Sequence, residues 1–304
     1  MYFLRRILFA IPLLLVISAL AFLLVHIAPG GPFDTERKPA SPEVERNLQA
    51  KYHLDEPIWK QYGRYLGDLA KGDLGVSLKY RNHSVNDIIA QGLPVSMLLG
   101  GLAFCFAMGL GIPFGFLTAA RRGAWVDYVG SFLTVLAVCV PSFVIAPFLI
   151  LILAMKLDLF PVGLWSTPWH MILPPIALGS YFVGMVARIL REGMLSAVQS
   201  EFVVAARAKG LGENPLLLKH ALRIALLPVV SYAGPMLADL LTGSFVIENI
   251  FQIPGIGVFL VNSSLNLDYT VVVGLSLLYA MLLIGLNLAV DFIYTMLDPR
   301  VKYE

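Results

Sequence analysis

The chain alternates between long apolar runs and shorter polar stretches. Six runs are long enough to cross the ~30 Å hydrocarbon core of a bilayer as helices, which takes about 20 apolar residues. They are Ile7–Ile27, Val95–Ala120, Tyr128–Met155, Met171–Ile189, Ala225–Ile247 and Val271–Leu297. The first run is longer than the roughly 7–15 apolar residues of a signal peptide, and no small-x-small cleavage site follows it, so we interpret it as a retained helix. The pattern predicts an all-α polytopic membrane protein with six transmembrane helices.

Composition supports the same class. Of the 304 residues, 58% are hydrophobic and 14% are charged, whereas soluble domains have about 45–50% apolar and about 25% charged residues. The net charge of +2 gives no indication of nucleic-acid binding. Cys105 and Cys139 both lie in apolar runs, and their spacing suggests neither a disulfide framework nor a zinc site.

Basic residues predict the orientation, because lysine and arginine accumulate in short cytoplasmic loops. With the N-terminus inside, twelve of them fall on the inside and only Lys156 falls in a short outside loop. The twelve are Arg5, Arg6, Arg121, Arg122, Arg188, Arg191, Arg207, Lys209, Lys219, Arg223, Arg300 and Lys302. The long segment between the first two spans does not count, since long segments cross membranes largely regardless of charge. We therefore predict that both termini are cytoplasmic.

These spans divide the chain into four parts. We predict an N-terminal transmembrane helix at 1–28, an extracytoplasmic insert at 29–93, a permease-like core at 94–293 and a cytoplasmic tail at 294–304. The core contains a cytoplasmic loop at 191–226, which is the longest polar stretch between its spans.

The insert contains two helix-like pieces. Ser41 is a suitable N-cap for the first, and Pro57 precedes the second, which ends before Gly72 and Gly75. The second piece presents apolar and aromatic side chains near helical spacing: Trp59, Tyr62, Tyr65, Leu66 and Leu69. We favour a small packed cap beside the membrane over a ligand-binding domain, because the insert is short.

The cytoplasmic stretch Glu201–Pro228 reads as helix, turn and helix. Gly210 and Gly212 suit a helix stop, because glycine enters left-handed backbone at little cost. Asn214 is then a candidate cap and Pro215 a candidate first residue of the next helix. The residues alone leave two interpretations open: the short helix docks in a groove of a partner protein, or it lies on lipid as an amphipathic helix.

Polar side chains within the spans are candidates for a translocation pathway. Such groups are costly in lipid and usually face protein or water. Asp239 and Thr242 share a face of the fifth span, Asn287 and Asp291 share one of the sixth, and Ser142 follows Pro141 in the third. The alternative is that these groups hydrogen-bond to neighbouring helices.

The sequence lacks the motifs of a self-contained enzyme or pump. It contains no G-x-x-x-x-G-K-[ST] phosphate loop, and its five histidines are scattered without a catalytic or metal-binding spacing. A proton-coupled secondary transporter stays open as an alternative function. That class needs embedded carboxylates and internal repeats, and the sequence offers one deep acid, Asp239, and no repeat.

Several stretches resemble one family. "AARAKGLGENPLLLKHALRIALLP" is similar to the EAA-loop motif of bacterial ABC importer permeases, in their peptide-transport branch. "LVHIAPGGPF" and "ENIFQIPGIGVFLVNSSLNLDY" resemble the same branch, and "KYHLDEPIWKQYGRYLGDLAKGDLGVSLKYRNHSVNDII" resembles the outer segment of the B-type permease of oligopeptide transporters. The chain departs from the motif at Val204, where the family has a glutamate.

The resemblance implies the type I ABC importer permease architecture and a place in the bacterial cytoplasmic membrane. It implies a second, C-type permease, two ATPase subunits that bind ATP and Mg, an external solute-binding protein and a peptide substrate, with no cofactor in this chain. The implied ATPase-coupling residues are Glu201, Ala205, Ala206, Lys209, Gly210, Leu211 and Gly212. Pro254, Gly255 and Gly257 form either a tight turn or a contact with the binding protein.

Overall fold

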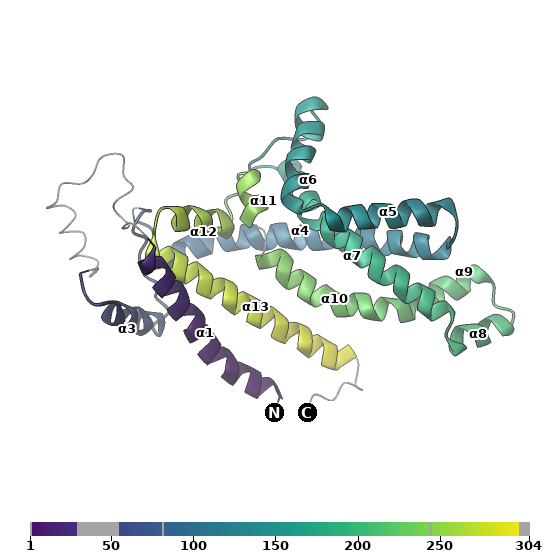
Figure 1. The fold of residues 1–304 in the computed structure, drawn as a ribbon, viewed down its shortest axis with the longest axis horizontal. Helices are drawn as coiled ribbons and strands as arrows, with labels where there is room; N and C mark the ends of the chain where they lie inside the picture. Colours follow the sequence, from purple (N-terminus) through teal and green to yellow (C-terminus); the bar gives the residue numbers. More distant parts are fainter. Residues whose placement is uncertain (1, 29–54, 81, 243–244, 298–304) are drawn as a thin grey trace. The chain divides into compact units, whose positions relative to one another are not determined.

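The computed structural model describes residues 2–28, 55–80, 82–242 and 245–297, and it is built from helices (Figure 1). The described residues fall into two compact units. One comprises those within Met1–Ser96 and Pro254–Leu288, and the other those within Met97–Ile253 and Ala289–Lys302. Each unit is described by itself below.

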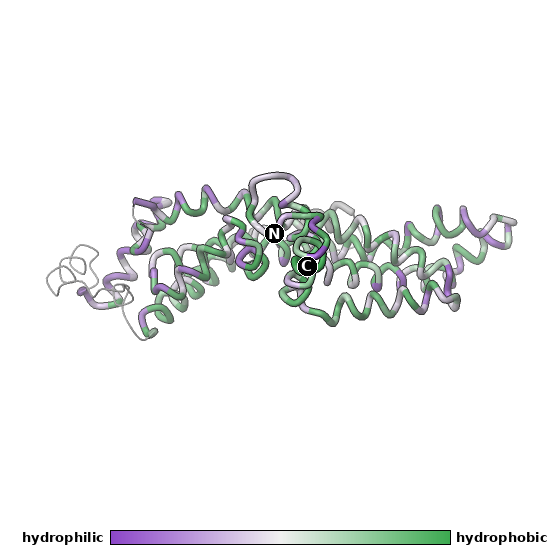
Figure 2. Tube along the Cα trace, turned by 90° about the horizontal axis from the view of Figure 1, so that it is seen from above, coloured by the Kyte–Doolittle hydropathy of each residue, from purple (hydrophilic) through white to green (hydrophobic). Residues whose placement is uncertain are grey.

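Five long apolar helices match five of the six predicted spans. They are α1 (Tyr2–Ile27), α4 (Val85–Ala120), α7 (Leu173–Val198), α10 (Leu222–Thr242) and α13 (Tyr269–Leu297). Each has the length and hydropathy to cross a membrane, and hydrophobic residues colour most of their length (Figure 2). The prediction of an all-α membrane protein is confirmed.

The third predicted span, Tyr128–Met155, is not one continuous helix. The segment forms α5 (Trp125–Cys139) and α6 (Ser142–Leu149), bent by 104° at the break between them, and continues as the π-helical turn η1 (Ile150–Lys156). Pro141 explains the break, because the residue before a proline is pushed out of the helical region. Val140 is indeed extended, with φ −92° and ψ 118°. The bent pair is at most one span.

Shorter helices connect these elements. They are α3 (Ile58–Leu69), η2 (Pro168–Met171), α8 (Glu201–Ala208), α9 (Glu213–Pro215), η3 (Leu216–Ala221), α11 (Phe245–Ile250) and α12 (Ile256–Leu265). Helix α3 begins after Pro57 and is followed by Gly72 at φ +80°, which confirms that prediction. The other helix expected in the insert, starting near Ser41, lies outside the described residues.

In the first unit, α3 packs along α1. The Tyr62 hydroxyl donates to the carbonyl oxygen of Leu15 at 3.1 Å and lies 2.9 Å from the Ser18 hydroxyl. Gln61 Oε1 lies 3.2 Å from Nε2 of His26. These contacts show that this part of the insert packs against α1.

Helix α4 begins at Val85, earlier than the predicted Val95, because a capping box starts it. The Ser84 backbone N–H donates to an Asp87 carboxylate oxygen at 3.0 Å, and the Asp87 N–H donates to the Ser84 hydroxyl oxygen at 3.1 Å. The first residues of the helix are then buried: Val85 and Ile88 belong to an apolar cluster with Leu74, Ile256, Val271, Leu275 and Leu277.

A buried carboxylate near the start of α13 connects distant segments of the first unit. Asp268 is fully buried and accepts hydrogen bonds from the backbone N–H groups of Leu78 at 3.1 Å and Lys79 at 3.2 Å. The hydroxyl group of Ser77 also donates to it. The carboxylate is therefore satisfied by three donors, and it ties the segment after α3 to the turn before α13.

In the second unit, α7 is the most deeply buried of the long helices. Glycines let its backbone lie against α4: a Cβ at Gly115 would lie 2.5 Å from the carbonyl oxygen of Ala187, and one at Gly179 would lie 2.8 Å from that of Ala103. Small residues at helix crossings are typical of membrane bundles, where close packing replaces the hydrophobic effect. Helices α5, α6 and α10 also pack on α7.

Candidate coupling site and translocation residues

The candidate coupling site is the helix–turn–helix element Glu201–Ala221, formed by α8, α9 and η3 at the junction of α7 and α10. Helix α8 follows the last residue of α7 after two residues, and Glu201 in its first turn is favourable beside the positive helix end. Val203 is fully buried and Ala206 half-buried, whereas Ala205 is exposed. One face of α8 therefore holds it to the chain, and the other is open.

Helix α8 ends in a Schellman motif. The Leu211 N–H donates to the carbonyl oxygen of Ala206 at 3.3 Å, and the Gly210 N–H donates to that of Arg207 at 3.0 Å. The motif requires a left-handed residue, and Gly210 supplies it with φ +85°. No atom lies within 4 Å of where a Cβ would stand at Gly210. The glycine is thus needed for its backbone conformation alone.

An ion pair bridges the turn. Arg207 Nε lies 2.8 Å from Glu213 Oε1, and its Nη2 lies 3.1 Å from Oε2. The carboxylate raises the pKa of the Arg207 guanidinium, so the pair stays charged. Both side chains are substantially exposed, so the pair fixes geometry more than it stabilises the fold. The sequence analysis missed this pair, although opposite charges flank the Gly-Leu-Gly.

The second helix restarts earlier than predicted. Gly212 is the N-cap, with φ −66° and ψ 154°, and Glu213 is the first helical residue. The prediction of Asn214 as cap and Pro215 as first helical residue is wrong by two positions. Proline is tolerated throughout the first turn, where backbone N–H groups have no helical acceptor, so Pro215 does not fix the start. The turn between the two helices is correspondingly tight.

The exposed side chains of this element include apolar as well as charged ones. Phe202, Val204 and Leu211 are 60%, 50% and 37% exposed. Lys209 is exposed beside them. Val204, the residue at the motif's glutamate position, is one of these exposed apolar side chains. Exposed apolar side chains beside charged ones can bind a groove in another protein.

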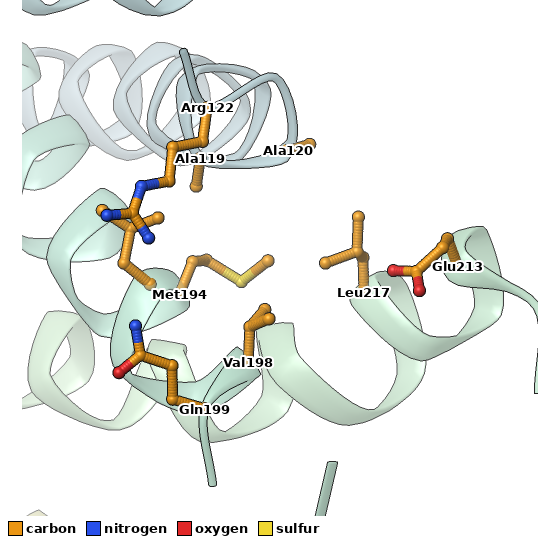
Figure 3. A pocket seen from close by; sticks show the side chains of 9 residues that line it. Ala119, Ala120, Arg122, Met194, Val198, Gln199, Glu213 and Leu217 are labelled. Atoms are coloured by element: carbon orange, nitrogen blue, oxygen red, sulfur yellow. The ribbon is translucent and has the colours of Figure 1, made fainter. Parts of the chain in front are cut away.

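A hollow of about 200 Å³ lies beside the element (Figure 3). Its walls come from the end of α4, the end of α7 and the restarted helix: Ala119, Ala120, Arg122, Met194, Leu195, Val198, Gln199, Glu213 and Leu217. The Arg122 side chain reaches over Met194, and Glu213 stands at the opposite side next to Leu217 (Figure 3). The three polar side chains, Arg122, Gln199 and Glu213, lie at the edges of an otherwise apolar surface.

An ion pair between Arg191 and Asp127 holds the C-terminal part of α7, which leads into the coupling element. Arg191 Nε and Nη2 donate to the two Asp127 carboxylate oxygens at 2.8 and 3.0 Å. Asp127 is buried, and it also accepts from the Gly123 N–H at 3.0 Å. This bidentate, charge-assisted pair ties the start of α5 to the end of α7. The sequence analysis used Arg191 only for orientation and did not predict its partner.

The predicted pathway residues are dispersed. In the second unit, Asp239 is exposed on α10, Thr242 is the last residue of that helix, and Ser142 is the half-buried first residue of α6. Asn287 is half-buried on α13 in the other unit. The side chains of Thr242 and Asp291 lie outside the described part. Exposure of a carboxylate on an apolar helix indicates that water or another protein meets it in the membrane.

The residues of the stretch Pro254–Gly257 (PGIG) differ in their exposure. Pro254 is exposed, whereas Gly255 and Gly257 are buried. A Cβ at Gly92 of α4 would lie 3.0 Å from the Ile256 nitrogen, and the Ile256 N–H donates to the Ser96 hydroxyl at 2.9 Å. The start of α12 therefore packs directly on α4 within the first unit.

Comparison with known proteins identifies the class. Residues 111–303 match the family described as "Binding-protein-dependent transport system inner membrane component", and residues 1–99 match its N-terminal companion family. The chain therefore belongs to the binding-protein-dependent ABC transport permeases. This membership confirms that it is a membrane transport subunit.

Curated relatives match almost end to end. The chain is 46% identical to the oligopeptide transport system permease protein OppB of Haemophilus influenzae over 98% of both chains, and 44% identical to OppB of Escherichia coli K12 over 99% of both. It is 42% identical to the dipeptide transport system permease protein DppB of Bacillus subtilis, over 95% of this chain and 94% of that protein.

A solved structure confirms the fold class. The inward-facing MetNI methionine ABC transporter contains a chain that matches with a TM-score of 0.56 and 16% identity. The match covers 69% of this chain and 96% of that one. At this identity the likeness supports the fold alone, which is that of a type I ABC importer permease.

Proposed function

We propose that this chain is the permease subunit of an ATP-driven peptide importer in the bacterial cytoplasmic membrane, with both termini cytoplasmic. The names of its relatives, which refer to oligopeptide and dipeptide transport, support the substrate class. The excess of twelve inside basic residues over one outside supports the orientation.

The proposed complex contains four further components besides the peptide. A C-type permease forms the other half of the translocation pathway, two ATPase subunits bind ATP and Mg, and an extracytoplasmic solute-binding protein delivers the peptide. This chain carries no phosphate-loop sequence, so nucleotide binding is assigned to the ATPases.

The observation that carries the proposal is the coupling element. Its outer surface includes the exposed residues Glu201, Ala205, Lys209, Leu211 and Gly212, with Ala206 at the edge, and these would contact an ATPase. Its inner side is fixed by the buried Val203 and Leu216. Because the Schellman turn at Gly210 and the Arg207–Glu213 pair make the element stiff, a displacement of α8 is passed to α7 and α10.

Within the membrane, Asp239 is the strongest candidate for the pathway. It is exposed on this chain, so in the complex it would face the space between the two permeases. Ser142, Thr242 and Asn287 are weaker candidates for the same role. At the outer end, the exposed Pro254 is the member of the PGIG stretch that a binding protein could touch directly, and Gly255 and Gly257 would shape that surface from beneath.

A reconstituted transport assay tests the proposal. The chain is purified with its partner subunits, placed in proteoliposomes and supplied with labelled di- and oligopeptides. Uptake is expected to require ATP and the binding protein and to be insensitive to a protonophore. Uptake that proceeds without ATP and collapses with the protonophore would instead identify a secondary transporter.

A further inference from the structure

The second unit carries an apolar groove between α4 and α5 that none of the proposed coupling or pathway residues lines. It consists of two adjoining hollows of about 400 and 150 Å³. Both are lined by Phe114, Leu117 and Leu133, so they form one continuous depression. We refer to it as the α4–α5 groove. The larger hollow extends to α7 at Gly184, and the smaller one ends at Trp125.

The groove offers nothing to a polar ligand. Its polar side chains are Thr118 and Thr134, and both hydroxyls donate within their own helices, to Phe114 or Gly115 at 3.1 and 3.0 Å and to Ser131 at 2.8 Å. All other lining side chains are apolar, apart from the indole N–H of Trp125 at the end. A hydrocarbon chain is therefore the chemistry that the groove fits.

The groove is open to the outside of the chain. Leu117 and Leu133 are 48% and 44% exposed. Its floor is formed where α4 and α5 approach closely, because a Cβ at Gly130 would overlap the Thr118 methyl group. An elongated apolar occupant can therefore enter from the side, along the length of the two helices.

The Trp125 end of the groove has the features of a membrane interface. Trp125 and Tyr128 are 73% and 70% exposed, and exposed aromatic residues of this kind gather at the headgroup level. Arg121 follows Leu117 by four residues, and its backbone N–H still donates a helical hydrogen bond to the carbonyl oxygen of Leu117 at 3.2 Å. It therefore continues the groove-lining face of α4 by one turn and is exposed at this end.

The acid nearest to Arg121 in the sequence is bonded to another residue. Asp127 lies on the first turn of α5, but its side chain is buried and bonded to Arg191. Arg121 thus meets the interface without that carboxylate beside it. A basic group at the headgroup level attracts anionic lipid.

We propose that the α4–α5 groove binds an anionic phospholipid, with one acyl chain along Leu117 and Leu133 and the phosphate at Arg121. The site lies at the cytoplasmic leaflet in the orientation proposed above. Lipid binding itself depends on neither the peptide substrate nor that orientation, so a failed transport assay would leave it standing. The occupant is a lipid and not a helix of the second permease. The reason is that the exposed aromatic residues Trp125 and Tyr128 and the cation Arg121 lie together at one end of the groove.

Photocrosslinking tests this site in the assembled complex. Trp125→p-benzoylphenylalanine places a photoreactive group at the groove's end, and vesicles of phosphatidylcholine and phosphatidylglycerol in known ratio surround the protein. Phosphatidylglycerol is expected to be enriched in the crosslinked lipid about fivefold over its bulk fraction, the effect of one basic residue near the surface. Phe148→p-benzoylphenylalanine, on the exposed apolar face of α6, is the matched control and should report the bulk composition.

Variants at Arg121 separate charge from general lipid contact. Arg121→Gln should bring the enrichment at position 125 down to the bulk ratio, and Arg121→Lys should keep most of it. Lys156→Gln, which removes another exposed cation, should change nothing. Crosslinks mainly to the second permease, enrichment equal to the control, or enrichment that survives Arg121→Gln would each overturn the proposal.

Discussion

Replacing Gly210 by valine should uncouple ATP hydrolysis from the membrane helices. Gly210 has φ +85°, a conformation that costs an L-residue about 1–2 kcal/mol. Since no atom lies within 4 Å of the missing Cβ, no steric clash adds to that cost. The stiff turn would therefore lose about 1–2 kcal/mol relative to its open alternatives, which lowers its population ratio about 5- to 30-fold.

The assay is peptide-stimulated ATP hydrolysis by the reconstituted complex, together with retention of the ATPase subunits on purification. Stimulation should fall with Gly210→Val and recover in part with Gly210→Asn, because asparagine tolerates the left-handed conformation. Gly123→Val is the matched control: Gly123 has φ +78° and equally open surroundings, but it lies in the turn between α4 and α5.

Comparing the two valine variants tests whether the turn at Gly210 has a specific role in coupling. If Gly210→Val and Gly123→Val reduce stimulation equally, backbone strain affects the whole fold and the turn at Gly210 has no special role. If Gly210→Val keeps full stimulation and full subunit retention, the element is not the mechanical link between ATPase and membrane helices.

Three further predictions follow from other parts of the chain. Asp127→Asn should lower the free energy of unfolding by about 1.5–3 kcal/mol, because charged hydrogen bonds to Arg191 are lost. Thermal unfolding in detergent would then show a lower midpoint temperature, and an unchanged midpoint would contradict the prediction. Asp239→Asn should reduce peptide uptake while the complex assembles normally, whereas Asp158→Asn, in an outer turn, should not; equal uptake in both would make Asp239 structural. A cysteine at His83 should react with an impermeant thiol reagent in intact spheroplasts and one at Lys209 only after lysis, and the reverse pattern would invert the proposed orientation.

Local features of the fold were predictable, and features that depend on distant partners were not. The long apolar runs predicted five helices, and Pro57 and Gly72 bracketed α3 correctly, because these signals act over a few residues. Pro141 signalled a weak point in the third span, but the 104° bend depends on what α6 packs against. The partners of Asp268 lie about 190 residues away in the sequence, and no local pattern indicates them.

The candidate site divides in the same way. The helix–turn–helix form of the coupling element and the need for Gly210 could be predicted, because a left-handed helix stop has a local signature. The Arg207–Glu213 pair and the half-buried position of Ala206 could not, since they depend on how α8 lies against the chain. The assignment of coupling and pathway roles to individual residues stays a prediction.

The buried Asp268 carboxylate also orders events during synthesis. Its hydrogen bonds to Ser77, Leu78 and Lys79 join positions about 190 residues apart in the chain. At roughly 5–20 residues per second, a ribosome needs on the order of 10–40 s to make the intervening chain. During that interval the segment after α3 has none of these bonds, and its backbone N–H groups are open to water or to a chaperone. A nascent permease released before the start of α13 would leave this segment without these hydrogen bonds.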